Sequence, residues 1–394
     1  MQQNVRLTSD SSVPQVIDEL NAGWRNEVVR ALGMDSSTFQ MAQGMLGLQS
    51  EDSSALFRMA DSVPPQSTTA YYDPSGKNKR STAYNGLLHA MLPTSSGNGL
   101  RAALGDQYAN WIAYRNADKS DDTQEALFKK WANRHLDPGK EAAALTAFKE
   151  AASDPLNLAL DNYVNKSFYT TFSGSASQMF ALPNYSCTID VARNAINSGS
   201  SATINYNSAT AKTSSTGTTV SGSASGFYDI FNGAASGSFE QLNQLATSSE
   251  FTISGTIGQY ATVVSNAAGW YDGSLVSRAY NGKNDNTIWD PNSNAGTWDS
   301  FFGANGSLAR RMSSLLLVSG YDLVVTSKAT YSASQFQQIK TQASFGIWPF
   351  FSASASSTHT QTYTHNEDGT LSVRYQLNKG LIAIWGATIQ NAPN

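Results

Sequence analysis

Two histidines near the end of the chain have the best residue type for acid–base chemistry, because imidazole titrates near neutral pH. They are His359 and His365, and the residues between them alternate as in a β-strand. Side chains alternate across a strand, so Gln361 and Tyr363 share one face with both histidines. At roughly 3.3 Å per residue the two imidazoles are about 20 Å apart, which is too far for one metal ion.

An enzyme hypothesis follows from this row of side chains. His359, Tyr363 and His365 would exchange protons with a substrate. A carboxylate, Asp322 or Asp290, would come from a neighbouring segment, in a site between two domains, where pockets commonly form.

The common catalytic motifs are missing, which argues against an enzyme. Residues Ser221 to Gly226 have the spacing of a nucleophile elbow, but Ala224 stands where the serine belongs. There is no phosphate-binding loop and no dinucleotide fingerprint. The other two histidines, His89 within a helical pattern and His135 at a helix end, have ordinary structural roles.

Four aspartates lie close together in the sequence and suggest a calcium or sugar site, since hard cations bind several oxygens. They are Asp272, Asp285, Asp290 and Asp299. Acids in a loop rich in asparagine are more commonly just solvated, so this is a weak candidate. Zinc sites of the usual cysteine and histidine kind are excluded by composition, and no cofactor is indicated.

The polar loop over residues 281–305 carries two tryptophans, Trp289 and Trp298. Aromatic side chains in such a loop either anchor it to the core or form a platform for a ligand, and we favour anchoring. Together with Gln361 they are the candidates for a binding surface.

Composition narrows the function classes. The net charge of −4 and the isoelectric point near 5.6 give no basic face for nucleic acid. The chain has a single cysteine, Cys187, so an intrachain disulfide is excluded. We interpret Cys187 as a small, buried hydrophobic residue.

Charge density changes near Lys166. Residues 1–166 hold 16 Lys or Arg and 19 Asp or Glu, and the rest of the chain holds 10 and 11. A chain of 394 residues suggests about two domains. We therefore predict an α+β fold with a bundle of five to seven helices over 1–166. A Ser/Thr/Gly-rich, mainly antiparallel β domain with short helical insertions follows over 167–394.

Apolar spacing of three and four residues predicts the helices of the first part. A helix begins near Val13 and ends at Gly33, and a shorter, weaker helical run covers Phe39 to Leu46. Further helices are expected over residues 83–91, 100–115, 123–135 and 138–152.

Period-two alternation dominates the second part. It predicts strands over residues 168–175, 203–206, 250–264 and 315–325, the last with a break at Gly320, and helices over 188–196, 227–245 and, as a single turn, 307–312. The chain ends in a three-strand meander between Ser344 and Gln390. Its aromatic residues Trp348, Phe350 and Trp385 are expected to fasten these strands to the core.

A membrane hypothesis uses the unusual composition of Ser201 to Phe231, where Lys212 is the one charge before Asp229. A hairpin that enters a bilayer needs strands of about 10 residues that alternate small apolar with polar side chains. Ser and Thr occupy both alternating sets here, so a surface hairpin or loop is the competing interpretation.

Our leading hypothesis is a non-catalytic protein that binds a surface or a membrane, in the manner of a toxin or effector, with β-hairpin pore formation. The alternatives are a self-assembling structural protein, favoured by low charge and long strands, and the enzyme above. The expected partners are a membrane or other surface and further copies of the chain, not nucleic acid.

The start of the chain, Met1 to Ser12, is polar and lacks the apolar core of a secretory signal. No stretch approaches the ~20 apolar residues of a transmembrane helix. We expect a soluble chain, for which secretion would need a non-standard route.

Overall fold

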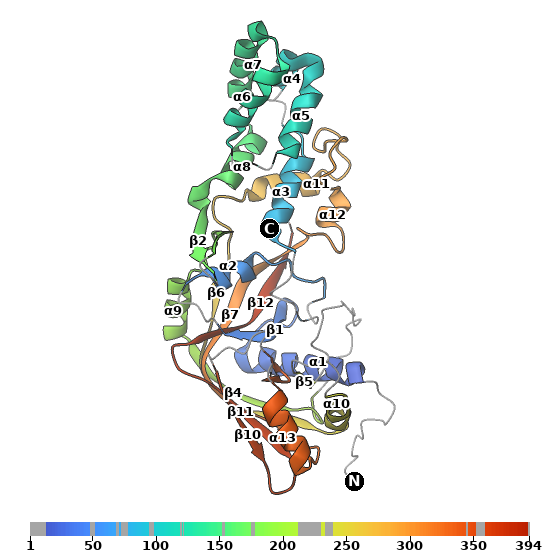
Figure 1. The fold of residues 1–394 in the computed structure, drawn as a ribbon, viewed down its shortest axis with the longest axis vertical. Helices are drawn as coiled ribbons and strands as arrows, with labels where there is room; N and C mark the ends of the chain where they lie inside the picture. Colours follow the sequence, from blue (N-terminus) through green and yellow to red (C-terminus); the bar gives the residue numbers. More distant parts are fainter. Residues whose placement is uncertain are drawn as a thin grey trace.

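The computed structural model describes residues 13–47, 52–67, 71, 78–93, 98–118, 120, 122–151, 154–174, 178–211, 230–232, 239–343, 346–351 and 359–392. The molecule is elongated, with helices gathered at one end and a twisted antiparallel sheet running from the middle to the other end (Figure 1). The predicted α+β fold class is confirmed.

Four helices make up the helical end. They are α4 (Asn98–Leu104), α5 (Tyr108–Ala117), α6 (Gln124–His135) and α7 (Pro138–Ala151), with the 3-10 turn η2 (Gly105–Gln107) after α4. Their core consists of their own residues, among them Trp111, Trp131 and Phe148. The rings of Phe128 and Phe148 stack with centroids 4.4 Å apart. The helices predicted over 123–135 and 138–152 are confirmed, whereas the single helix predicted over 100–115 is two helices, α4 and α5, separated by η2.

Seven strands form the main sheet, and all of its pairs are antiparallel. They are β1 (Phe39–Gly47), β4 (Ser200–Asn207), β6 (Phe251–Val264), β7 (Arg310–Ser327), β10 (His359–His365), β11 (Leu371–Leu377) and β12 (Ile382–Asn391). One edge of β7 pairs with β6, which in turn pairs with β4. The other edge pairs with β11 and then β12, which lie end to end along it. The three predicted terminal strands are confirmed, with β10 and β11 as the hairpin.

The two faces of the central strand β7 change places at Gly320, so that different residues point to each of the two hydrophobic cores before and after it. Before this residue, Leu316 belongs to one core and its neighbour Leu317 to another. After it, Leu323 belongs to the first core, so odd-numbered residues have replaced even-numbered ones. Gly320 has φ +65°, a conformation that favours glycine, and it lies against Gly258 of β6. The predicted break is wrong, because β7 runs without interruption from Arg310 to Ser327, and Gly320 marks instead the change of face.

The first of these two cores, which we call the sheet core, lies under α1 (Val13–Leu32). The ring of Trp24 is 6.0 Å from that of Trp385 and 6.1 Å from that of Phe350. Trp348, Phe350 and Trp385 are all buried, as predicted. Short elements complete this core: β5 (Phe231–Asn232), α10 (Glu240–Thr247), α13 (Ala333–Gln342), β8 (Gly346–Ile347) and β9 (Phe350–Phe351).

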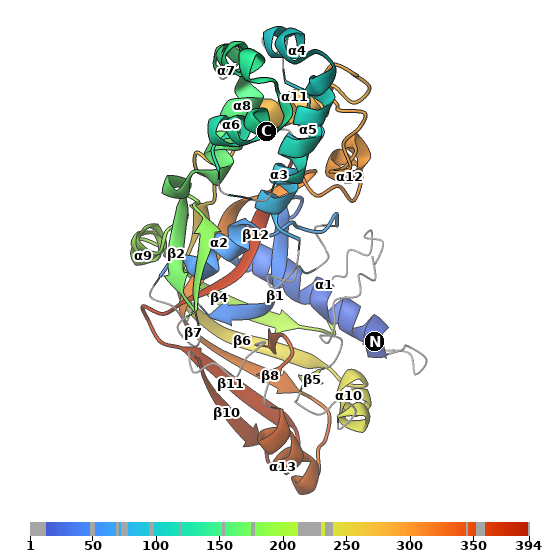
Figure 2. The same cartoon turned by 45° about the horizontal axis from the view of Figure 1, so that its top comes forward.

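The second core, the junction core, lies between the sheet and the helical end (Figure 2). It gathers α2 (Ser54–Ala60), α3 (Arg80–Ala90), α8 (Pro155–Val164), η3 (Lys166–Phe168), β2 (Tyr169–Ser173), β3 (Met179–Pro183), α9 (Ile189–Asn197), α11 (Gly273–Asn281) and α12 (Trp298–Phe302). The rings of Tyr84 and Tyr271 are 4.8 Å apart within it. Cys187 is fully buried here, and burial raises the pKa of its thiol to about 12. The thiol is therefore a core side chain rather than a nucleophile.

Several local predictions are wrong. The helix predicted over 227–245 is contradicted at Phe231–Asn232, which form strand β5, and only its end lies in a helix, α10. The run Phe39 to Leu46 is strand β1, whose residues pair with β12 from Thr388 to Ala383, so sheet pairing overrides a weak helical spacing. Residues 307–312 do not form a helix, because Arg310 already begins β7.

Whether residues 1–166 and 167–394 fold as independent domains stays a prediction. The contacts between the two halves are nevertheless extensive. Helix α1 packs on the sheet, and β1 is one of its strands. The part of the chain before residue 167 therefore supplies the helical end and also a share of both other cores.

Candidate functional site

The strand that carries the histidine row is β10, at one edge of the sheet. The predicted alternation holds, since Thr360, Thr362 and Thr364 are exposed and the intervening Gln361 and Tyr363 are half-buried. Tyr363 and His365, two of the side chains singled out for chemistry, therefore lie with Gln361 on the inner face, towards the sheet core. His359 takes its place in the row through its backbone, which pairs with Leu377.

The contacts of this row are structural. The Nε2 atom of His365 lies 2.8 Å from the carbonyl oxygen of Tyr331, and its ring stacks on Phe336 of α13 with centroids 5.1 Å apart. The hydroxyl of Tyr363 donates to Oε1 of Gln361 at 3.0 Å. Burial raises the pKa of Tyr363 to about 12, so this phenol stays protonated at neutral pH.

Asp322, the carboxylate assigned to the same chemistry, lies on the opposite face of the sheet. It accepts hydrogen bonds from Nε and Nη2 of Arg374 and, at 3.1 Å, from Nε2 of Gln376. These bonds lower the pKa of its carboxyl. The alternative carboxylate, Asp290, lies in the loop between α11 and α12. Its backbone N–H donates to the carbonyl oxygen of Ala90, the last residue of α3. The structure does not bring the proposed acid–base set together.

The four candidate metal ligands each serve their own turn or helix. Asp272 caps α11 by accepting from Ser274 N at 2.8 Å, and Asp290 accepts from Asn292 N at 2.9 Å. Asp299 pairs with Lys283 at 3.1 Å on the surface.

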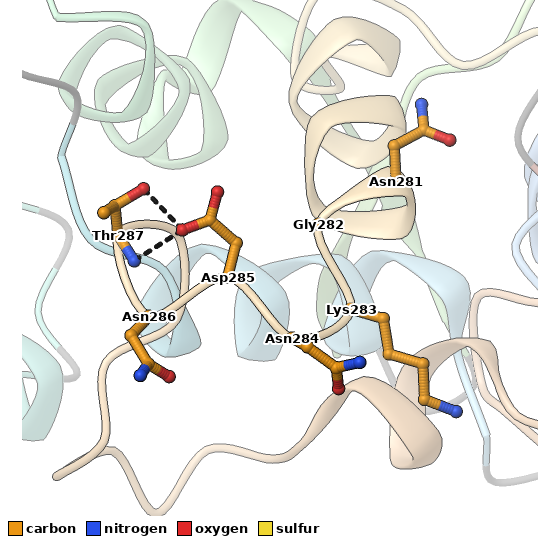
Figure 3. Close-up of a pocket in the computed structure, with 7 residues that line it drawn as sticks. All are labelled: Asn281, Gly282, Lys283, Asn284, Asp285, Asn286 and Thr287. Carbon is orange, nitrogen blue, oxygen red and sulfur yellow. Dashed lines mark hydrogen bonds between the residues drawn. The ribbon is translucent and has the colours of Figure 1, made fainter.

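Asp285 lies in an open pocket lined by residues 281–287. Figure 3 shows its carboxylate turned to the backbone and hydroxyl of Thr287, and the lining asparagine side chains pointing in different directions. Within the described ranges, no group of three or more His, Cys, Asp or Glu is arranged to hold a metal ion.

The loop tryptophans are anchored, as we favoured. The indole N–H of Trp289 donates to Gly282 at 2.7 Å, and that of Trp298 donates to Tyr280 at 2.8 Å. Both rings are partly buried against the junction core.

The remaining histidines also have the structural roles expected of them. Nδ1 of His89 lies 2.8 Å from the carbonyl oxygen of Asn85, within α3. Burial is the main cause that lowers the pKa of His89. His135, in the last turn of α6, stacks on Trp131 with centroids 5.5 Å apart.

A feature that sequence reasoning missed is the common level at which four strands of the sheet end. In the register of the sheet, Asn207 at the end of β4 pairs with Thr252, and Phe251 at the start of β6 pairs with Ser327. Ser327, the last residue of β7, also pairs with Leu371, the first residue of β11. Segment 208–250 therefore leaves and re-enters the sheet at one level, between β4 and β6. Segment 328–370 does so between β7 and β11, and its later part includes the edge strand β10, which pairs with β11.

The two segments are equal in length and similar in composition. Their charged residues are Lys212, Asp229, Glu240 and Glu250 in the first and Lys328, Lys340, Glu367 and Asp368 in the second. They also contact each other, because β5 of the first pairs with β8 of the second. The described part of each segment includes a short helix that packs on the inner face, α10 and α13 respectively.

The five strands at this end have one apolar and one polar face. The inner face carries Ile204, Ile253, Leu323, Val325 and Val373, all buried. The outer face carries Thr203, Asn205, Asn207, Thr252, Ser254, Thr256, Asp322, Val324, Thr326, Ser372, Arg374, Gln376, Thr360, Thr362 and Thr364. We call these side chains the polar face. Its two charges, Asp322 and Arg374, neutralise each other.

Comparison with known proteins places the chain in no family. No family model, no curated protein and no solved structure matches it. In the part of the chain that the structure describes, no helix has the length and apolar character needed to cross a bilayer.

Proposed function

We propose that this chain is a non-catalytic membrane-binding protein, whose segments 208–250 and 328–370 leave the sheet core and enter a bilayer as β-hairpins. The observation that carries the proposal is the common level of the four strand ends. Each segment joins two antiparallel neighbours there, so an extended segment would prolong a pair of strands that is already in register. In the second segment β10 would have to give up its pairing with β11 for this to happen.

Length and charge support this assignment. A strand needs about 9–11 residues to cross the hydrocarbon of a bilayer, so a hairpin needs roughly 25 residues with its turn. Both segments exceed that length. Residues 213–228 of the first and 341–366 of the second contain no Asp, Glu, Lys or Arg, and charges are the groups that cost most in hydrocarbon.

Extension of the segments would expose apolar side chains that the sheet core now buries. Phe231 and Phe239 of the first segment are buried in this core, and so are Phe336, Trp348 and Phe350 of the second. Leaving them in water costs about 1.5–3 kcal/mol each, so release is unfavourable in solution and favourable only where lipid receives these side chains. The contact between Phe231 and Tyr331, with centroids 6.1 Å apart, links the two segments and would couple their release.

Backbone groups in lipid must be hydrogen-bonded within protein. The outer edges of two hairpins cannot satisfy this requirement alone, so the inserted state requires further copies of the chain. Pore formation by these hairpins therefore requires an oligomer of the chain.

The test is a series of single cysteines, each labelled with a polarity-sensitive dye, in a Cys187→Ala chain. Positions 218 to 225 and 352 to 358 are probed one by one, with Lys140→Cys on the exposed side of α7 as the control. On vesicles of mixed anionic and zwitterionic lipid, we expect alternate positions to enter an apolar environment while the control stays in water. Leakage of vesicle contents and oligomers in sedimentation should accompany the change.

Two results would contradict the proposal. One is the absence of binding and leakage with every lipid mixture. The other is binding in which all labelled positions remain in water.

Self-assembly remains a second candidate, because β10 is nearly palindromic. Its residues 359–365 read His, Thr, Gln, Thr, Tyr, Thr, His. Antiparallel pairing with a second copy about Thr362 would set Thr360 against Thr364 and His359 against His365. Cross-strand threonine pairs stabilise sheets, and uncharged edges favour pairing. In the described part of the chain, β11 is the one strand paired with β10.

Sedimentation across a concentration series tests this alternative. Thr362→Lys should abolish a dimer, because it places two like charges opposite each other, whereas Thr256→Lys on the polar face of β6 should leave it intact. A monomer at all concentrations rules the alternative out.

A further inference from the structure

Two arginines from distant parts of the chain converge at the junction of α3, α11 and β7. Arg80 is the first residue of α3, and Arg311 is the second residue of β7. Both line one small cavity, together with Tyr271 and Ser277 from around α11 and Ala392 after β12. This place lies outside the segments discussed above.

Arg80 is almost fully buried, with 3% of its surface exposed. Its guanidinium lies over the ring of Tyr271, with Cζ 4.1 Å from the centroid. No described carboxylate lies within salt-bridge distance of it. A buried cation without a charged partner is costly, because ions lose several kcal/mol of hydration on burial.

Arg311 adds a second positive charge whose contacts are neutral. Its Nη2 donates to Oε1 of Gln390 at 2.8 Å, and its Nη1 to Oδ1 of Asn266 at 3.4 Å. Its Nε is buried and makes no hydrogen bond within the described part of the chain. Burial lowers the pKa of Arg311, and the positive charge of Arg80 lowers it further.

The nearest acidic side chains are used elsewhere. Asp61 accepts hydrogen bonds from Ser81 and from Tyr185 at 2.9 Å. Asp272 caps α11. Within the described residues, neither carboxylate forms an ion pair with Arg80 or Arg311.

We propose that the cavity between Arg80 and Arg311 binds one small monovalent anion, with chloride as the ion that fits its size and charge. The space open to the centre of a water-sized guest is only about 10 Å³, so the cavity has room for one small guest and excludes phosphate, sulfate and lipid headgroups. Arg80, Arg311 and the hydroxyl of Ser277 in the cavity wall can supply the donors. The anion would join α3, α11 and β7, and so fasten the helical part of the molecule to the sheet.

Thermal unfolding at constant ionic strength tests the site, with sodium chloride replaced stepwise by sodium gluconate, whose anion is too large for the cavity. A ligand that binds only the folded state stabilises it as its concentration exceeds Kd. We expect Tm to rise with chloride and to saturate, by about 2 °C at roughly ten times Kd. Arg80→Met should abolish this response, and Arg101→Met, which removes an exposed arginine over Tyr108 in the helical end, should retain it.

A second measurement covers the case in which Arg80→Met fails to fold. Crystals grown with sodium bromide should show an anomalous peak between Arg80 and Arg311. A Tm of the wild-type chain that does not depend on chloride, or a bromide crystal without this peak, would show that the cavity holds water and overturn the proposal.

Discussion

The helical end and the sheet core are built in opposite ways. Every residue of the helical core lies between Leu100 and Ala151. The sheet core joins residues as far apart in the chain as Val16 and Trp385. One region is therefore held by local contacts and the other by contacts between the two ends of the chain. The free energies at which the two regions open can therefore differ.

The largest expected effect comes from Trp385→Ala, which removes the centre of the long-range core. Its ring contacts Trp24 and Tyr321, with centroids 6.0 and 5.8 Å away, and it is fully buried. We expect a loss of about 3–5 kcal/mol in the free energy of unfolding, measured by denaturant titration. Trp298→Ala, on a partly buried ring of the junction core, is the matched control and should cost less. An unchanged midpoint for Trp385→Ala would show that the terminal strands are peripheral.

A smaller and more local effect is expected from Leu127→Ala in α6. This buried side chain belongs to the helical core alone, and its truncation costs about 2–4 kcal/mol. Native-state hydrogen exchange should show faster exchange in α4 to α7, with protection of β6 and β7 unchanged. Equal acceleration in both regions would mean that the helical end and the sheet unfold as one unit.

The smallest effect is expected on the polar face of the sheet, where Asp322 and Arg374 form an exposed ion pair. The pair lowers the pKa of Asp322, chiefly through hydrogen bonds from Arg374. The stabilisation is therefore present above the unfolded pKa of aspartate, about 3.9, and is lost as pH falls through the lower folded value. Asp322→Asn should lower Tm slightly at pH 7, and this difference should vanish below about pH 3. A constant difference at all pH values would assign it to packing.

Local patterns were sufficient for the helical end, because apolar residues three and four apart in α5, α6 and α7 pack against one another. They were insufficient for β1, whose partner β12 follows more than three hundred residues later. The histidine row of β10 was placed on the correct strand and the correct common face. That Asp322 lies on the other face follows only from the register of β7 and β11, which no single stretch of sequence contains.

The same limit applies to the strand ends. The low charge of residues 201–231 pointed to a hairpin, and residues 212–229 lie outside the described part of the chain. The similarity of the second segment, 328–370, to the first could not be recognised from the sequence. It depends on the pairing of β6 with β7, which places the four strand ends at one level.

The contact of Gly258 with Gly320 has a mechanical consequence. Neighbouring rows of the sheet are braced by side chains that pack across strands, whereas at this row a Cβ on Gly258 would come within 2.9 Å of the carbonyl oxygen of Gly320. Glycine opposite glycine offers no side chain to resist rotation about the strand axis, so we expect β6 and β7 to twist more readily at this row than where side chains pack across the strands. A torque applied at the strand ends near Ser327 would be absorbed at this row before it reached the junction core.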